Sequence, residues 1–452
     1  MRPRVRVIAT AGHVDHGKSS LLVRLTGIDP DRWAEEKRRG LTIDLGYAWC
    51  TLPGGREVGF VDVPGHERFI RNMLAGVGPV RLVLFVVAAD EGWKPQSEEH
   101  LQILDVLGVA GGVVALTKRD LVDDETLAIA EQEVRERLAE TGLADAPIVP
   151  VSAQTGEGIE ALAAALEAML AAAPPPERAR TRLFVDRVFT IRGAGTVVTG
   201  TLTGDCLAVG DEVALEPTPE RGRIRSLQTH KRQEERACPV SRVAANLVGV
   251  DRAALERGDV LAVPGAWRPT TVVDATLREA RGLATPIGER GAFKVHAGAA
   301  EADATLRLAT TPGGARVARL RLSRPLVLDV GDRFVLRDAG RRATVGGGVV
   351  LDIAPPRSFA RAEHLWMLER RARAGRDELP GLLIEERRAL PAREVALLTG
   401  ASAPPDRTTG HWCVAPEVRD AAVDALREVL GAHHAARPLA EGLDLATVRA
   451  AT

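Results

Sequence analysis

The chain has 452 residues, of which 45% are apolar, with 60 Lys and Arg against 61 Asp and Glu. This length and apolar content suit about three packed domains and argue against wholesale disorder. The net charge of −1 excludes a global electrostatic attraction to nucleic acid, so any RNA contact must come from local patches.

The cysteines and the N-terminus indicate where such a chain would work. The four cysteines are scattered without a CxxC pair, which favours a reducing, cytoplasmic environment and argues against a disulfide framework. The N-terminal residues show no signal-peptide pattern. The longest apolar run, residues 82–89, is too short to cross a bilayer. We therefore expect a cytoplasmic protein without membrane contact.

Residues 4–172 alternate between short β-branched runs and helical patterns. This alternation predicts a doubly wound, mainly parallel sheet in a domain at residues 1–172. The strands are expected in VRVIATAG, VGFVDVPG, RLVLFVVAA, GGVVALTK and APIVPVSA. The helices are expected in SSLLVRLTG, RNMLAGVG, EEHLQILDVLG, ETLAIAEQEVRERLAETG and IEALAAALEAMLAAA. The segment PPPERAR (174–180) then makes a stiff linker.

Short strands separated by glycine turns follow the linker. They predict two small β-barrels, one at residues 182–265 and the other at 267–355. Helical periodicity returns after residue 355, where PAREVALLTGAS (391–402) is typical of a short helix and turn. A fourth region, 356–452, is therefore rich in helix.

The segment GHVDHGKS (12–19) follows the first predicted strand and opens a helix, which is the context of a phosphate-binding loop. Its glycines let backbone N–H groups turn onto phosphate oxygens, and the helix N-terminus adds a positive dipole. Lys18 is placed to reach the β- and γ-phosphates, and the Ser19 hydroxyl to bind Mg²⁺. The alternative is a plain glycine turn. The residues expected to contact nucleotide here are Gly12, His13, Val14, Asp15, His16, Gly17, Lys18, Ser19 and Ser20.

The segment DVPGH (62–66) ends a predicted strand and can serve the γ-phosphate. Asp62 suits a carboxylate on the Mg²⁺ side, and the Gly65 amide can turn toward the γ-phosphate. His66 lies where a side chain can orient the attacking water. Upstream, KRRGLT (37–42) has the character of a solvated switch segment, and Thr42 is the expected metal ligand beside Ser19 and Asp62.

The segments TKRD (117–120) and VSA (151–153) predict a guanine site. Asp120 can accept hydrogen bonds from the N1–H and the exocyclic amine of guanine, and Lys118 can lie along the base. Ser152 and Ala153 supply a backbone N–H for the guanine carbonyl. The usual guanine motif has Asn where this chain has Thr117, which weakens one orienting contact and leaves the carboxylate in place. We therefore expect GTP and GDP, with Mg²⁺, as ligands.

These motifs together resemble those of the translational GTPase superfamily. EEKRRGLTIDLGYAW, FVDVPGHERFIRNMLAGVG and VDRVFTIRGAGTVVTGTL are similar to selenocysteine-specific elongation factors of the SelB type, over residues 5–355. The resemblance implies a multidomain protein with an α/β P-loop GTPase domain, two β-barrels and an α-rich, winged-helix-like C-terminal region. It also implies a monomer that binds selenocysteinyl-tRNA in its GTP form. Such a protein delivers this tRNA to the ribosome at recoded UGA codons, where GTP is hydrolysed.

The same resemblance assigns a pocket and a gate. The aminoacyl pocket would be formed by Tyr47, Asp186, Arg187 and Arg242, although a lone Arg on a barrel strand is more often simply solvated. We expect Asp186 to hold Arg187. Val14 and Leu41 would form an apolar gate beside His66. The expected catalytic residues are His66, Lys18, Val14 and Leu41.

The C-terminal region matches this family less closely. Bacterial members hold a hairpin element of the selenoprotein mRNA with their last winged-helix modules. Here residues 356–452 allow one module and part of a second, and their Arg residues are balanced by acidic ones, without a basic stripe. We expect either a truncated chain, ending within LATVRAAT, or an mRNA recognition that is delegated or lost.

Three rival interpretations predict other functions. The first is a general aminoacyl-tRNA carrier or a relative of an initiation factor, against which VDRVF and SRVAANLVG argue. The second is the regulatory subunit of a sulfate-activating enzyme, which would not protect aminoacyl-tRNA. The third is an RNA-binding scaffold with silent GTPase motifs, which the intact Lys18, Thr42, Asp62 and His66 oppose.

Overall fold

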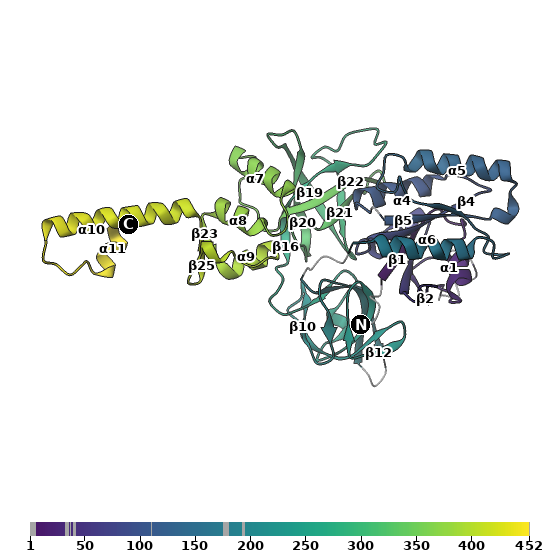
Figure 1. The fold of residues 1–452 in the computed structure, drawn as a ribbon, viewed down its shortest axis with the longest axis horizontal. Coiled ribbons are helices and arrows are strands. Elements are labelled where there is room, and N and C mark those ends of the chain that lie inside the picture. Colours follow the sequence, from purple (N-terminus) through teal and green to yellow (C-terminus); the bar gives the residue numbers. More distant parts are fainter. Residues whose placement is uncertain are drawn as a thin grey trace. The chain divides into compact units, whose positions relative to one another are not determined.

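A computed structural model describes residues 6–31, 36, 38, 42–109, 111–174, 180–191 and 195–451. It divides the chain into two compact units, residues 1–310 with 316–355, and residues 311–315 with 356–452 (Figure 1). Within the described ranges, no helix combines the length and the apolar character needed to cross a membrane.

The first unit begins with a six-stranded sheet in the order β2-β3-β1-β4-β5-β6. Its neighbours pair in parallel except β2, which runs antiparallel to β3 at the edge. The strands are β1 (Arg6–Ala11), β2 (Gly46–Thr51), β3 (Glu57–Asp62), β4 (Leu82–Ala88), β5 (Gly111–Thr117) and β6 (Ile148–Pro150). The helices are α1 (Lys18–Thr26), α3 (Ile70–Val77), α4 (Pro95–Val106), α5 (Asp124–Leu138) and α6 (Ile159–Ala172). The mainly parallel α/β sheet expected from the sequence is confirmed.

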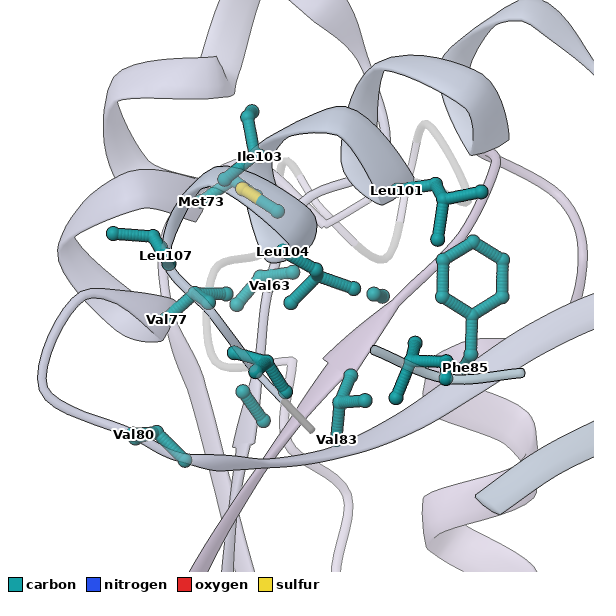
Figure 2. Packing of buried hydrophobic residues seen from close by; sticks show 14 of the residues in the cluster. Val63, Met73, Val77, Val80, Val83, Phe85, Leu101, Ile103, Leu104 and Leu107 are labelled. Atoms are coloured by element: carbon teal, nitrogen blue, oxygen red, sulfur yellow. The ribbon is translucent and has the colours of Figure 1, made fainter. Parts of the chain in front are cut away.

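The central strand β4 is buried on both faces, and its side chains alternate between two hydrophobic clusters. Val83 and Phe85 face the cluster formed with α3, α4 and α5, whereas Leu84 and Val86 face the cluster formed with α1 and α6. Figure 2 shows the first cluster, where Phe85 lies beside Leu101 of α4. Truncating a fully buried Phe costs about 3–5 kcal/mol, so this packing fixes the strand ends that carry the site.

Two closed β-barrels follow in the same unit. In the first, the sheet order β10-β15-β7-β8-β14-β11-β12 closes by a β10–β11 pairing, and in the second, β16-β20-β19-β18-β21-β22-β17 closes by β16–β22. The first barrel contains β7 (Arg182–Ile191), β8 (Gly195–Thr203), β10 (Glu212–Glu216), β11 (Arg221–Thr229), β12 (Arg232–Glu234), β14 (Ser241–Val248) and β15 (Val260–Ala262). Two short strands of the same region, β9 (Leu207–Ala208) and β13 (Arg236–Ala237), pair with each other in a separate sheet. The second contains β16 (Thr270–Thr276), β17 (Arg278–Glu279), β18 (Phe293–Ala297), β19 (Ala300–Thr310), β20 (Arg316–Leu326), β21 (Arg333–Asp338) and β22 (Ala343–Asp352).

The first barrel contains a disulfide between Cys206 and Cys238, which corrects the expectation of none. Cys206 follows β8 and Cys238 precedes β14, and these strands are neighbours that pair Leu202 with Ser241. Cysteines 32 residues apart in sequence therefore meet at one end of the ladder, which their spacing alone does not reveal. Cys50 and Cys413 are free thiols.

The second unit is mainly helical, as expected for the C-terminal region. A three-stranded sheet, ordered β23-β25-β24, accompanies the helices. Its elements are α7 (Ala362–Arg373), α8 (Leu379–Arg387), β23 (Ala389–Pro391), α9 (Ala392–Thr399), β24 (Thr408–Thr409), β25 (Trp412–Val414), α10 (Pro416–Ala436) and α11 (Leu445–Ala451).

Candidate functional site

The loop between β1 and α1 forms a tight cradle of backbone groups. Gly12 has a φ of +129°, and a Cβ at this residue would lie 2.1 Å from the carbonyl oxygen of Val86. Gly65 closes the opposite side, where a Cβ would lie 2.5 Å from the Val14 nitrogen and 2.6 Å from the Lys18 Nζ atom. Only glycine fits at either position, so the backbone stays open for a ligand.

Lys18 is a buried cation at the floor of this cradle. Its Nζ atom donates to the carbonyl oxygens of Gly12 at 3.1 Å and His13 at 2.6 Å. Burial lowers the pKa of Lys18 to about 8, because a charged ammonium group is poorly solvated there. A phosphate group would supply the missing negative charge, so the chemistry of the cradle fits a nucleotide polyphosphate.

Five oxygen-bearing side chains converge beside Lys18. Ser19 Oγ donates to Asp62 Oδ2 at 2.7 Å and lies 2.9 Å from Thr42 Oγ1. Thr42 Oγ1 also donates to Asp31 Oδ1 at 3.0 Å, and Thr10 Oγ1 donates to Asp62 Oδ1 at 2.7 Å. Hydroxyl and carboxylate oxygens are the ligands that Mg²⁺ prefers, so the three residues predicted to hold it lie together.

Asp31 was missed by the sequence reasoning. Burial raises its pKa to about 6, and neighbouring carboxylates act in the same direction. Burial likewise raises the pKa of Asp62. A cation beside these two carboxylates would relieve both effects. The motif DPD at residues 29–31 carries no spacing that distinguishes Asp31 from a turn residue.

Helix α4 supports the phosphate loop from behind. Gly12 N–H donates to His100 Nδ1 and Val14 N–H donates to Gln96 Oε1, both at 3.0 Å. Gln96 and His100 are four residues apart, so they lie on one face of the helix. This pair was also missed, because Ser97, Glu98, Glu99 and Gln102 make a polar residue unexceptional in this helix.

The remaining loop residues differ in burial. Asp15 and Ser20 are exposed, and Asp15 has a positive φ of 63°. His13 is half-buried, and its ring centroid lies 5.0 Å from that of the buried His16. Burial lowers the pKa of His16 to about 3, so this ring is neutral.

His66 follows Gly65 at the start of the next helical segment. Its Nδ1 atom accepts the backbone N–H of Arg68 at 3.2 Å. A neutral ring that accepts at Nδ1 carries its proton on Nε2, so His66 would meet a water or phosphate oxygen as a donor. Val14 is half-buried nearby, and its predicted gate partner Leu41 lies outside the described residues.

Thr117 connects the base-binding segment to the phosphate loop. Its hydroxyl donates to the carbonyl oxygens of His16 at 2.7 Å and Val87 at 3.2 Å. Threonine therefore keeps a side-chain contact between the two loops despite the departure from Asn in the guanine motif.

Lys118 and Asp120 occupy the following turn. Lys118 has a left-handed φ of 59°, and its Nζ atom lies 3.2 Å from Asp90 Oδ2 and 2.8 Å from Glu91 Oε1. These carboxylates hold the ammonium group at the edge of the loop. Asp120 is exposed, so its carboxylate is accessible to a ligand.

Ser152 is already committed to its own loop. Its N–H donates to the carbonyl oxygen of Glu157 at 2.9 Å, and its Oγ atom accepts the N–H of Thr155 at 3.0 Å. Of the two residues expected to present an N–H to the guanine carbonyl, Ala153 is therefore the better placed.

The four residues of the expected aminoacyl pocket lie together, between β2 and the first barrel. The guanidinium carbon of Arg242 lies 4.1 Å from the centroid of the Tyr47 ring, and that of Arg187 lies 4.9 Å from it. Arg242 forms an ion pair with Asp186 and donates to Thr201 Oγ1 at 3.0 Å. Burial raises the pKa of Tyr47, so its hydroxyl stays protonated.

The pairing inside this cluster corrects one expectation. Asp186 holds Arg242, whereas Arg187 is held by Asp44, whose Oδ2 atom accepts from Nε at 3.2 Å and from Nη2 at 3.0 Å. The β7–β8 register shifts between Val185 and Arg187, which marks a bulge at Asp186. A bulge re-aims a side chain, and this change in direction is not visible in a strand pattern.

Comparisons with known proteins agree with this arrangement. Residues 3–172 match the family model "Elongation factor Tu GTP binding domain", and residues 273–357 match "Selenocysteine-specific elongation factor, beta-barrel domain". The chain resembles a crystal structure of a bacterial selenocysteine-specific elongation factor, EF-Sec, with a TM-score of 0.83 and 30% identity. That match covers 98% of this chain and 75% of the other.

Two curated relatives carry the same name. The selenocysteine-specific elongation factor of Desulfomicrobium baculatum is 38% identical, over 97% of this chain and 73% of its own length. The factor of Escherichia coli K12 is 40% identical, over 82% of this chain and 59% of its own length. A GTP-binding translation factor architecture is thus shared along nearly the whole chain, and the protein belongs to the family of selenocysteine-specific elongation factors.

Proposed function

We propose that the protein binds selenocysteinyl-tRNA in its GTP form and delivers it to the ribosome at recoded UGA codons, where GTP is hydrolysed to GDP and phosphate. We further propose a cytoplasmic monomer with domains at 1–172, 182–265, 267–355 and 356–452. One observation carries the proposal: Tyr47 lies against two guanidinium groups at the junction of the switch segment and the first barrel.

The charges around Tyr47 favour an anionic ligand. Arg187 and Arg242 lie against the Tyr47 ring and pair with Asp44 and Asp186, and Arg257 Nη1 adds a third guanidinium group 3.5 Å from Asp44 Oδ1. Among the described residues, Arg257 Nε and Nη2 are buried and have no hydrogen-bond partner. A selenol is largely ionised at neutral pH, whereas a serine hydroxyl is neutral and a cysteine thiol mostly protonated. The cluster therefore supports selection of the selenolate.

The nucleotide site supports the dependence on GTP. In this proposal Lys18 and the loop amides bind the phosphates, and Asp120 reads guanine. Ser19, Thr42 and Asp62 would hold Mg²⁺, which neutralises charge on the phosphate oxygens when bound. Thr42 would bind Mg²⁺ only in the GTP form, because the switch segment closes on the site only when the γ-phosphate is present.

Hydrolysis is proposed to need the ribosome. In this proposal His66 donates from Nε2 to the attacking water or to a phosphate oxygen. Its Nδ1 atom accepts the Arg68 N–H, and this hydrogen bond holds the ring against its own loop. An outside partner would have to move the ring into line. In this proposal Val14 forms one side of the gate that the ring passes, with Leu41 opposite.

Protection of the aminoacyl ester tests the proposal. Selenocysteinyl-tRNA and seryl-tRNA on the same tRNA body are incubated with the protein and either a non-hydrolysable GTP analogue or GDP. The rate of deacylation is measured. We expect slow deacylation only for selenocysteinyl-tRNA with the GTP analogue. The proposal is wrong if both aminoacyl-tRNAs are protected equally, or if neither is protected.

A further inference from the structure

The short segment from Thr42 to Tyr47 connects the two sites. At one end, Thr42 Oγ1 lies 2.9 Å from Ser19 Oγ, among the oxygen-bearing side chains beside Lys18. At the other end, the Tyr47 ring lies against Arg187 and Arg242 of the first barrel. Asp44, which holds Arg187, lies between these ends.

Asp44 is the residue of this segment that contacts the pocket arginines. Its Oδ2 atom accepts from Arg187 Nε and Nη2 at 3.2 and 3.0 Å, and its Oδ1 atom lies 3.5 Å from Arg257 Nη1. Arg187 Nη2 also donates to the backbone oxygen of Leu45. The guanidinium side chains of Arg187 and Arg257 are 17% and 22% exposed, so water competes weakly for these contacts.

The backbone around Asp44 is held on both sides. Glu36 Oε1 accepts the N–H groups of Ile43 at 3.0 Å and Asp44 at 3.1 Å. Asn72 of α3 donates through Nδ2 to the Ile43 oxygen at 2.7 Å and accepts Arg257 Nη1 at 2.8 Å. The segment is thus fixed to α3 and to the first barrel at the same point.

Only Ile43 separates Thr42 from Asp44, so their Cα atoms are at most about 7 Å apart, and Glu36 and Asn72 hold the backbone between them. A displacement of Thr42 must therefore move Asp44, and with it the carboxylate that orients Arg187. We propose that Asp44 is the positioning residue that couples the position of Thr42 in the nucleotide site to the orientation of Arg187 in the aminoacyl pocket. This inference rests on the proposed function.

The substitution Asp44→Asn tests the coupling. It keeps the size of the side chain but removes the charge that holds two arginines. Affinity for selenocysteinyl-tRNA is measured with a GTP analogue and with GDP, and the ratio of the two affinities is compared with that of the unsubstituted protein. We expect this ratio to fall roughly 10- to 150-fold, the range of one charge-assisted contact. By linkage, the factor by which the tRNA tightens the GTP analogue relative to GDP should fall by the same amount.

Glu57→Gln is the matched control. Glu57 Oε1 accepts a hydrogen bond from Arg232 Nη1 at 2.7 Å. This ion pair also joins the first domain to the first barrel, but it starts from β3 and lies away from the switch segment. Its loss should leave the ratio unchanged. Thermal unfolding of both variants separates a general loosening of the barrel from a change in coupling.

The outcomes are distinguishable. If Asp44→Asn lowers both affinities equally, Asp44 is only an ion pair between domains, and the inference is overturned. If the unsubstituted protein does not prefer the GTP analogue, the proposed function itself fails. Should Asp44→Asn fold poorly, Asp44→Glu is measured in the same way, because it keeps the charge and shifts the carboxylate by one methylene group. The ratio must fall for this variant too, and an unchanged ratio overturns the coupling.

Discussion

Substitutions in the buried pair of Arg242 and Asp186 can show whether Arg242 stabilises the barrel or binds the selenolate. Their side chains are 13% and 2% exposed. Arg242→Gln would leave Asp186 charged and buried, and among the described residues Thr199 Oγ1, at 3.0 Å, would be its one remaining donor. Removing one partner of a buried pair costs about 3–5 kcal/mol of folding free energy. Losing a charge-assisted contact to the selenolate costs roughly 1.5–3 kcal/mol of binding, or about 10- to 150-fold in affinity.

The double variant Arg242→Gln/Asp186→Asn distinguishes these two losses. Because both partners become neutral, most of the folding free energy should return, measured as the urea unfolding of the first barrel. Affinity for selenocysteinyl-tRNA with a GTP analogue should stay low, while that for seryl-tRNA changes little. If selenocysteinyl-tRNA binding recovers together with stability, Arg242 supports the barrel and does not contact the selenolate, and the charge argument is refuted.

Three further results are expected. Asp120→Asn should shift preference from guanine to xanthine nucleotides in competition binding, and a retained preference for GTP would show that Asp120 does not read the base. His66→Ala should leave the Kd for GTP unchanged while abolishing ribosome-stimulated phosphate release; equally fast release would exclude His66. Burial lowers the pKa of His100 to about 3 from 6.5, so below pH 6.5 the unfolded chain binds a proton that the folded chain does not, and stability falls. His100→Gln, which keeps an acceptor for Gly12 N–H, should remove about 2 kcal/mol of the stability difference between pH 7 and pH 5 in urea unfolding, and an unchanged difference would contradict this reading.

The phosphate loop shows what a sequence predicts well. Its glycines, Lys18 and Ser19 are adjacent in the chain, so strand, turn and helix signals place them together without tertiary information. The same holds for Asp62, because consecutive parallel strands end at one edge of the sheet. The five parallel strands of the sheet were predicted for this reason, whereas the antiparallel β2 edge was not among them, because the alternation of strand and helix gives no signal there.

Contacts between domains were harder to predict. The resemblance placed Arg187 in the pocket, but the bulge at Asp186 and the approach of Asp44 depend on how the first barrel packs on β2. The Cys206–Cys238 pair depends in the same way on strand order within the barrel. No local pattern encodes such pairings, because each joins segments whose separation in sequence is unrelated to their distance in space.

Tyr47 is the one tyrosine among the 452 residues, and it lies against both pocket arginines. A protein made with 3-fluorotyrosine would therefore carry a single fluorine-bearing side chain, positioned 4.1 and 4.9 Å, measured from its ring centroid, from two guanidinium carbons. The chemical shift of ¹⁹F responds strongly to nearby charge. Because only this side chain carries fluorine, its signal needs no assignment. The signal would report how the two arginines move when nucleotide or aminoacyl-tRNA is added, and no residue has to be mutated.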